Sequence, residues 1–86
     1  MKTSLLAVLA LTLAPIAASA MPMVGDVVGT NPKDATAALA AKGFTVKEFE
    51  AEGGKIEAKG TDEAGKYFEV YIDPKTGAVT KVSDKD

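Results

Sequence analysis

The chain has 86 residues, enough for one small domain, and its formal net charge is −2. It contains no histidine and no cysteine, so its composition excludes nucleophile–histidine triads, thiol catalysis, and the usual zinc and haem sites. Its basic residues are all lysines, interspersed with acids and without a basic run, so nucleic acid is not an expected partner. We therefore expect a non-enzymatic protein that holds no metal and no cofactor.

The first twenty residues have the pattern of a signal peptide. Lys2 provides the positive start, an apolar run follows over residues 5–14, and Pro15 ends it. Residues 18–20 (ASA) form a small-x-small cleavage site. The apolar run is shorter than the about 20 residues that a membrane span needs. We expect export to the periplasm or beyond the cell, cleavage after Ala20, and no membrane attachment afterwards.

The remaining residues, 21–86, are predicted to form one domain with its core at 27–82. Asn31 suits a helix N-cap and a proline follows it, while Gly43 suits the position just after a helix. These signals predict a helix over Pro32–Lys42. Residues 21–30, here called the lead-in, are expected to be an extended segment or a short turn that packs its valines against the core. Its apolar face at offsets of three and four consists of Ala35, Ala38 and Leu39.

The first predicted strand, Phe44–Ala51, contains an irregularity. Phe44 and Val46 are two residues apart and so share one face, but Phe49 falls on the opposite face of a regular strand. Either the strand bulges near Lys47-Glu48, which would return Phe49 to the first face, or Phe49 covers the outer face of the sheet.

The second strand is expected at Lys55–Lys59, with Ile56 and Ala58 inward, and residues 60–65 (GTDEAG) form a polar connection. The segment Lys66–Val82 has the pattern of a hairpin, because Asp73–Gly77 (DPKTG) carries the residue types of a tight turn. The third strand presents two different faces: Phe68, Val70 and Ile72 on one, and Tyr67, Glu69 and Tyr71 on the other.

The predicted fold is therefore α+β, with one short helix packed on a four-stranded antiparallel β-meander. Residues 83–86 are expected to be a frayed polar end.

Acidic residues gather on one face of the first two strands: Glu48, Glu50, Glu52 and Glu57. Carboxylates that share a face could bind a hard cation or a polar small molecule. The lysines beside them, Lys47, Lys55 and Lys59, equally allow ordinary cross-strand ion pairs on a solvated surface. If the carboxylates bind a ligand, the chain would be a small-molecule or cation-binding envelope protein.

The tyrosine face of the third strand is the other candidate. If the helix covers one face of the sheet, then Tyr67, Glu69 and Tyr71 lie on the bare face, together with Phe49 if its strand does not bulge. Such an aromatic patch would suit a protein partner. The alternative is that the tyrosines only shield their own sheet.

These segments together resemble the PepSY domain, in particular its small stand-alone exported versions. The resemblance rests on Gly43-Phe44 after the helix, the E-x-E-x-G of Glu50–Gly54, and Y-F-E-V-Y-I-D-P-x-T-G-x-V over Tyr67–Val79, and it extends over Val27–Val82. It implies a helix with an antiparallel sheet, a location outside the cytoplasm, and a role in inhibiting or regulating peptidases. That role is drawn from PepSY domains in the propeptides of secreted metallopeptidases, and the family brings no catalytic residues.

Overall fold

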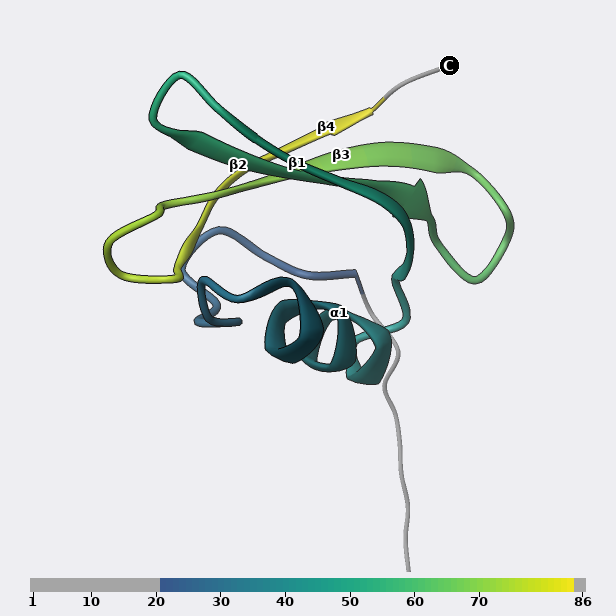
Figure 1. Ribbon diagram of the computed structural model, residues 1–86. Helices are drawn as coiled ribbons and strands as arrows, with labels where there is room; N and C mark the ends of the chain where they lie inside the picture. The colour runs from purple at the N-terminus through teal and green to yellow at the C-terminus, as the bar shows by residue number, and fades with distance from the viewer. Residues whose placement is uncertain (1–20, 85–86) are drawn as a thin grey trace, which may run out of the picture.

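A computed structural model describes residues 21–84, and the predicted signal peptide and the last two residues lie outside this part. The chain forms helix α1 (Pro32–Ala41) and strands β1 (Thr45–Glu52), β2 (Lys55–Thr61), β3 (Tyr67–Ile72) and β4 (Val79–Asp84). The strands lie in the order β1-β2-β3-β4 and every neighbouring pair is antiparallel. The predicted α+β fold, one helix and a four-stranded meander, is confirmed (Figure 1).

Helix α1 begins as its sequence predicts. The Asn31 side chain accepts a hydrogen bond from the backbone N–H of Asp34 at 3.1 Å, and Pro32 takes the first turn, where its missing N–H costs nothing. The helix ends one residue earlier than predicted, because Lys42 leaves helical geometry as the C-cap. Gly43 follows with φ 87°, a conformation that glycine adopts without strain.

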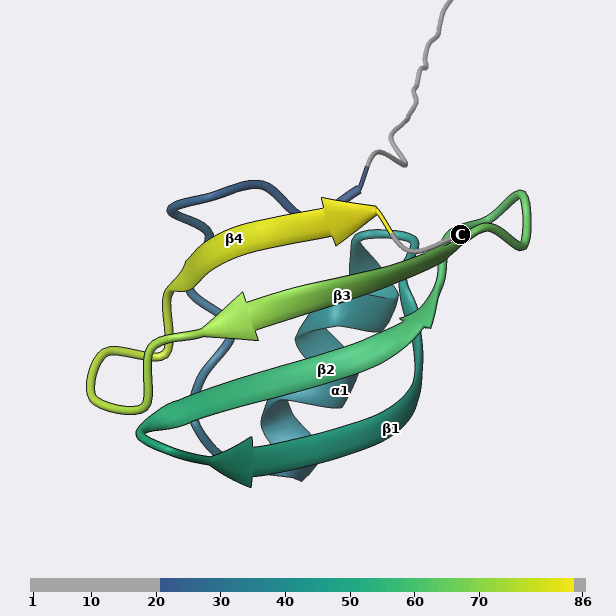
Figure 2. The ribbon, with the colours of Figure 1, turned by 90° about the horizontal axis from the view of Figure 1, so that it is seen from above.

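Helix α1 lies against one face of the sheet, and within residues 21–84 no other element covers the opposite face (Figures 1 and 2). Ala35 and Leu39 are fully buried beneath the sheet, and the alanine allows the helix to approach closely. Among residues 21–84, the buried core cluster consists of Val28, Ala35, Leu39, Phe44, Ile56, Ala58, Val70, Ile72 and Val79. Ile56 and Ala58 point inward as predicted.

Strand β1 bulges, which decides the position of Phe49. The pairing of β1 with β2 shifts between Val46 and Glu48, so an extra residue, Lys47, enters β1 there. Phe49 is then opposite Ala58, which is fully buried, and it packs against the core. The predicted alternative in which Phe49 covers the outer face is wrong, and Phe49 does not lie beside the tyrosines.

Strand β2 is longer than predicted and contains Gly60, which had been assigned to a polar connection. Gly60 lies opposite both Val46 and Phe68. A Cβ at this position would overlap the backbone carbonyl oxygen of Thr45. A glycine inside a strand often marks such a close backbone approach, and here it lies opposite the region of the β1 bulge.

The predicted frayed end is also partly wrong, because β4 continues through Ser83 to Asp84. Ser83 pairs with Glu69, and Asp84 pairs with Phe68. The Asp84 carboxylate forms an ion pair of 2.9 Å with the ammonium of Lys66, which immediately precedes β3 at the same open end of the hairpin. The hairpin therefore extends further than its apolar pattern indicates.

The lead-in joins the sheet beside β4. Backbone bonds link Gly25 N–H to the Val79 carbonyl at 2.9 Å and Val79 N–H to the Asp26 carbonyl at 2.8 Å. The Gly77 carbonyl, in the turn after β3, accepts from the N–H groups of Val28 and Gly29. The lead-in thus covers the edge of β4 at its beginning (Figure 2).

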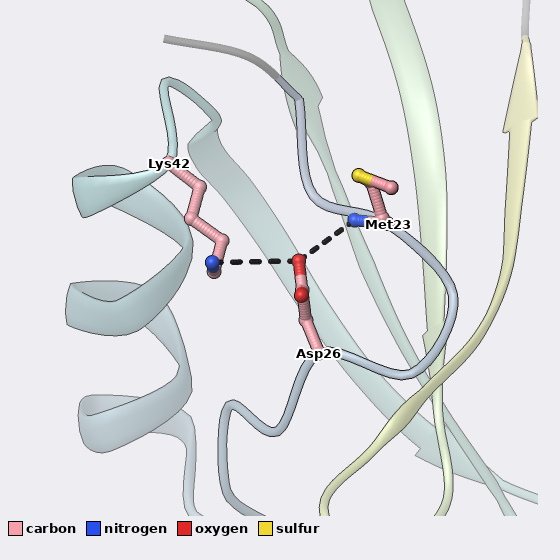
Figure 3. Close-up of polar contacts among 3 residues, drawn as sticks. All are labelled: Met23, Asp26 and Lys42. Carbon is pink, nitrogen blue, oxygen red and sulfur yellow. Dashed lines mark hydrogen bonds and ion pairs between the residues drawn. The ribbon is translucent and has the colours of Figure 1, made fainter. Parts of the chain in front are cut away.

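Asp26 ties this lead-in to the end of the helix (Figure 3). Its carboxylate accepts a hydrogen bond from the Met23 backbone N–H at 2.8 Å and forms an ion pair of 3.5 Å with Lys42. These two contacts lower the pKa of Asp26, with the Met23 hydrogen bond as the larger cause. Within residues 21–84, no helix is long and apolar enough to cross a bilayer.

Candidate partner-binding face

The face of the sheet turned away from α1, here called the outer face, carries the predicted tyrosines. Cross-strand partners lie on the same face, so the register assigns its members. One row joins Glu50, Glu57, Tyr71 and Lys81, and the next joins Glu48, Lys59, Glu69 and Ser83. The sheet therefore separates an apolar inner face from a charged and aromatic outer face, which is turned toward the viewer in Figure 2.

Tyr71 contacts both acidic and basic side chains of this face. Its hydroxyl donates a 2.9 Å hydrogen bond to Glu69 Oε1. The ammonium groups of Lys55 and Lys81 lie 5.7 and 5.4 Å from the centre of its ring, within the range of cation–π attraction. The Glu69 hydrogen bond raises the pKa of Tyr71, with partial burial and the charge of Glu57 acting in the same direction.

Tyr67 lies on the same face but apart from Tyr71. It is opposite Thr61, is 48% exposed, and is four residues along the strand from Tyr71. At the rise of a β-strand this separation is about 13 Å. With Phe49 on the inner face, the outer face has two separate aromatic positions and not one continuous patch.

One acidic residue of β1 forms an ion pair with a lysine of β2. Glu50 forms a 3.4 Å ion pair with Lys59, and this contact raises the pKa of Lys59. Glu57 lies between Glu50 and Tyr71 in the same cross-strand row. Within residues 21–84, no group of three or more acidic side chains converges closely enough to hold a metal ion. The geometry of the described carboxylates therefore favours cross-strand ion pairs over the cation-binding interpretation.

A hollow beside Tyr71 was not foreseen from the sequence. It has a volume of about 390 Å³ and is lined by Lys55, Tyr71, Thr80 and Lys81. The register of β3 with β4 shifts here, from Tyr71 opposite Lys81 to Ile72 opposite Val79, so Thr80 is an extra residue. The signal in the sequence was the spacing of Val79 and Val82, since apolar residues three apart cannot share a face of a regular strand.

A short helix behind an antiparallel sheet, with a charged and aromatic face left bare, defines a small α+β module suited to surface contacts. A family model described as peptidase propeptide and YPEB domain matches residues 3–83. The chain belongs to this family, the PepSY domains, as the resemblance had indicated, and the match is longer than the segment that carried that resemblance. Searches of curated proteins and of solved structures found no match. Family membership supports a protein as the partner in general.

Proposed function

We propose that this chain is a non-enzymatic, exported binding module that inhibits or regulates a peptidase of the cell envelope. The observation that carries the proposal is the family match over residues 3–83, because the family is that of peptidase propeptides. The signal-peptide pattern of the first twenty residues supports export, since it places a positive residue, an apolar run and a small-x-small site in order.

The fold favours the outer face over the sheet edges as the contact surface. A partner strand could pair with an open edge, but β1 bulges at Lys47 along its edge, and bulges and charged residues discourage such pairing. The edge of β4 is covered at its beginning by the lead-in. The outer face carries Tyr67, Glu69 and Tyr71, and no helix or strand of the described part of the chain covers it.

The test is a peptidase assay with a matched pair of variants. The protein is purified from the exported fraction, and its mass establishes the residue at which it begins, with Met21 as the expectation. It is then incubated with the secreted and envelope peptidases of the source cell, and peptide hydrolysis is measured. We expect reduced hydrolysis, and weaker reduction with Tyr71→Ala.

Lys33→Ala serves as the control, because Lys33 is exposed on α1, on the other side of the sheet. Far-UV circular dichroism and urea unfolding establish that both variants remain folded. Unchanged peptidase activity, together with affinity capture that recovers the same proteins with Tyr71→Ala as with the unmodified chain, would remove the proposal.

A further inference from the structure

The hollow beside Tyr71 is bordered by two lysines that form no ion pair with a carboxylate of residues 21–84, although Glu52 lies opposite Lys55 in the cross-strand register. Among residues 21–84, ion pairs join Lys42 to Asp26, Lys59 to Glu50 and Lys66 to Asp84. Lys55 and Lys81 have no carboxylate partner within ion-pair distance in that part of the chain, and their described contacts are with the Tyr71 ring. Both side chains are exposed, so an anion can reach them from solvent.

The β4 bulge is the reason that these groups surround one space. In a regular strand, consecutive residues point to opposite faces, so Thr80 and Lys81 could not both border a hollow on one side. The extra residue allows both to do so. The Thr80 hydroxyl also donates a long, 3.4 Å hydrogen bond to the Tyr71 carbonyl, which joins the bulge to β3.

Charge on the outer face is divided between its two sides. Glu48, Glu50, Glu52 and Glu57 lie on β1 and β2, whereas Lys81 lies on β4. Lys55, at the beginning of β2, is opposite Glu52. An extended polyanion laid across this face would meet the acidic residues after passing the lysines, and like charges at short range repel. A single carboxylate placed between the two lysines avoids that repulsion.

We propose that this hollow binds an aspartate or glutamate side chain from an extended segment of a partner protein, with the carboxylate between Lys55 and Lys81. The neighbouring apolar part of that segment would lie on the Tyr71 ring. This binding site would define which chemical group of a partner the outer face recognises. It depends on the proposed function in one respect only, namely that the partner is a protein.

The experiment is an NMR titration of the full exported chain with two capped peptides. One carries a single glutamate among uncharged residues, and the other replaces that glutamate by glutamine. We expect the glutamate peptide to give saturable shifts at the amides of Lys55, Tyr71 and Lys81, and the glutamine peptide to give none. The shifts should shrink as salt is added, because exposed ion pairs are screened.

Lysine-to-glutamine variants measure each cation separately. Lys55→Gln and Lys81→Gln should each weaken binding of the glutamate peptide by roughly two- to fivefold, the range for exposed ion pairs. The double variant should weaken it more than either single variant does, and the two factors are not expected to multiply, because both lysines contact the same carboxylate. Lys33→Gln makes the same change of charge on the far side of the sheet and should leave binding unchanged.

Three results would overturn the proposal. The first is that the glutamine peptide binds as tightly as the glutamate peptide. The second is that Lys33→Gln weakens binding as much as Lys55→Gln or Lys81→Gln does. The third is that inorganic phosphate binds more tightly than the glutamate peptide, which would assign the hollow to a phosphate group. The peptidase assay is independent of this titration. If the glutamate peptide binds saturably but no peptidase is affected, the hollow is a carboxylate-binding site and the proposed function is rejected. If a peptidase is inhibited but the glutamate peptide does not bind, only the carboxylate-binding site is rejected.

Discussion

The two faces of this sheet are made by the same four strands, yet they have opposite properties. On the inner face, Ala58 and Val70 are fully buried under Leu39 and its helix. On the outer face, the residues next to them in the chain contact charged side chains. Lys59 forms an ion pair with Glu50, and the Lys81 ammonium lies over the Tyr71 ring. The comparison indicates that packing on the inner face maintains the fold, whereas the outer face can vary in charge at little cost in stability.

The largest expected effect comes from the inner face. Leu39→Ala removes the one large side chain that α1 buries, and we expect it to lower the free energy of unfolding by about 2–5 kcal/mol. This is a large fraction of the stability of so small a domain. Urea unfolding followed by circular dichroism measures the loss.

Val24→Ala is the control, because Val24 is 66% exposed on the lead-in. It should lower the free energy of unfolding by less than about 0.5 kcal/mol. A comparably small loss for Leu39→Ala would mean that α1 does not pack on the sheet as described, and the contrast between the two faces would fail.

Gly60→Ala is expected to have the next largest effect. Its added Cβ would overlap the Thr45 carbonyl oxygen, a backbone atom that cannot rotate away. We expect destabilisation at the upper end of the about 1–3 kcal/mol typical of overpacking. Thr61→Ala, the next residue in β2, should change stability by less than about 1 kcal/mol. If the two variants proved equally stable in urea, β1 and β2 would not approach as closely as described.

Gly60 also illustrates where the sequence misleads. The helix, the four strands and the hairpin turn could be predicted because each rests on local patterns: the Asn31 cap, alternation in β3, and the turn residues from Asp73. Gly60 looks like a turn residue for the same local reasons. Its role depends on the β1 backbone, fifteen residues earlier at Thr45, and periodicity carries no information about that distance.

The two bulges explain the remaining differences at the candidate site. Both appear in the sequence as apolar residues three apart, Val46 and Phe49 in β1 and Val79 and Val82 in β4. The first was recognised as one of two possibilities, and the structure selects the bulge. The second was not recognised. Thr80 and Lys81 were therefore not predicted beside Tyr71, although Tyr67, Glu69 and Tyr71 were correctly placed on the face opposite Val70.

A smaller effect is expected at Asp26, which lies outside both faces. Its pKa is lowered in the folded state, so its contacts contribute stability above the pKa of the unfolded chain and lose it as the pH falls through the folded value. Asp26→Asn should reduce the urea midpoint near neutral pH, because the ion pair with Lys42 is lost. Well below the ordinary carboxyl value of 3.8, the difference from the unmodified chain should shrink. A difference that grew on acidification would contradict these contacts.

The smallest expected effect on stability, and the most specific one, concerns Tyr71 on the outer face. In a Tyr67→Phe background, tyrosinate absorbance reports Tyr71 alone, and its titration should lie above the ordinary value of 10.0. The stability that comes from the raised pKa of Tyr71 is present below the tyrosine pKa of the unfolded chain, and it is lost as the pH rises through the pKa of the folded state.

Glu69→Gln should move the Tyr71 pKa back toward 10.0, because the glutamine side chain accepts the hydrogen bond from the hydroxyl without carrying a charge. Glu48→Gln, a change of charge elsewhere on the face, should move it less. A Tyr71 pKa that did not respond to Glu69→Gln would mean that the pair is open in solution, and Tyr71 would then be able to offer its hydroxyl to a partner.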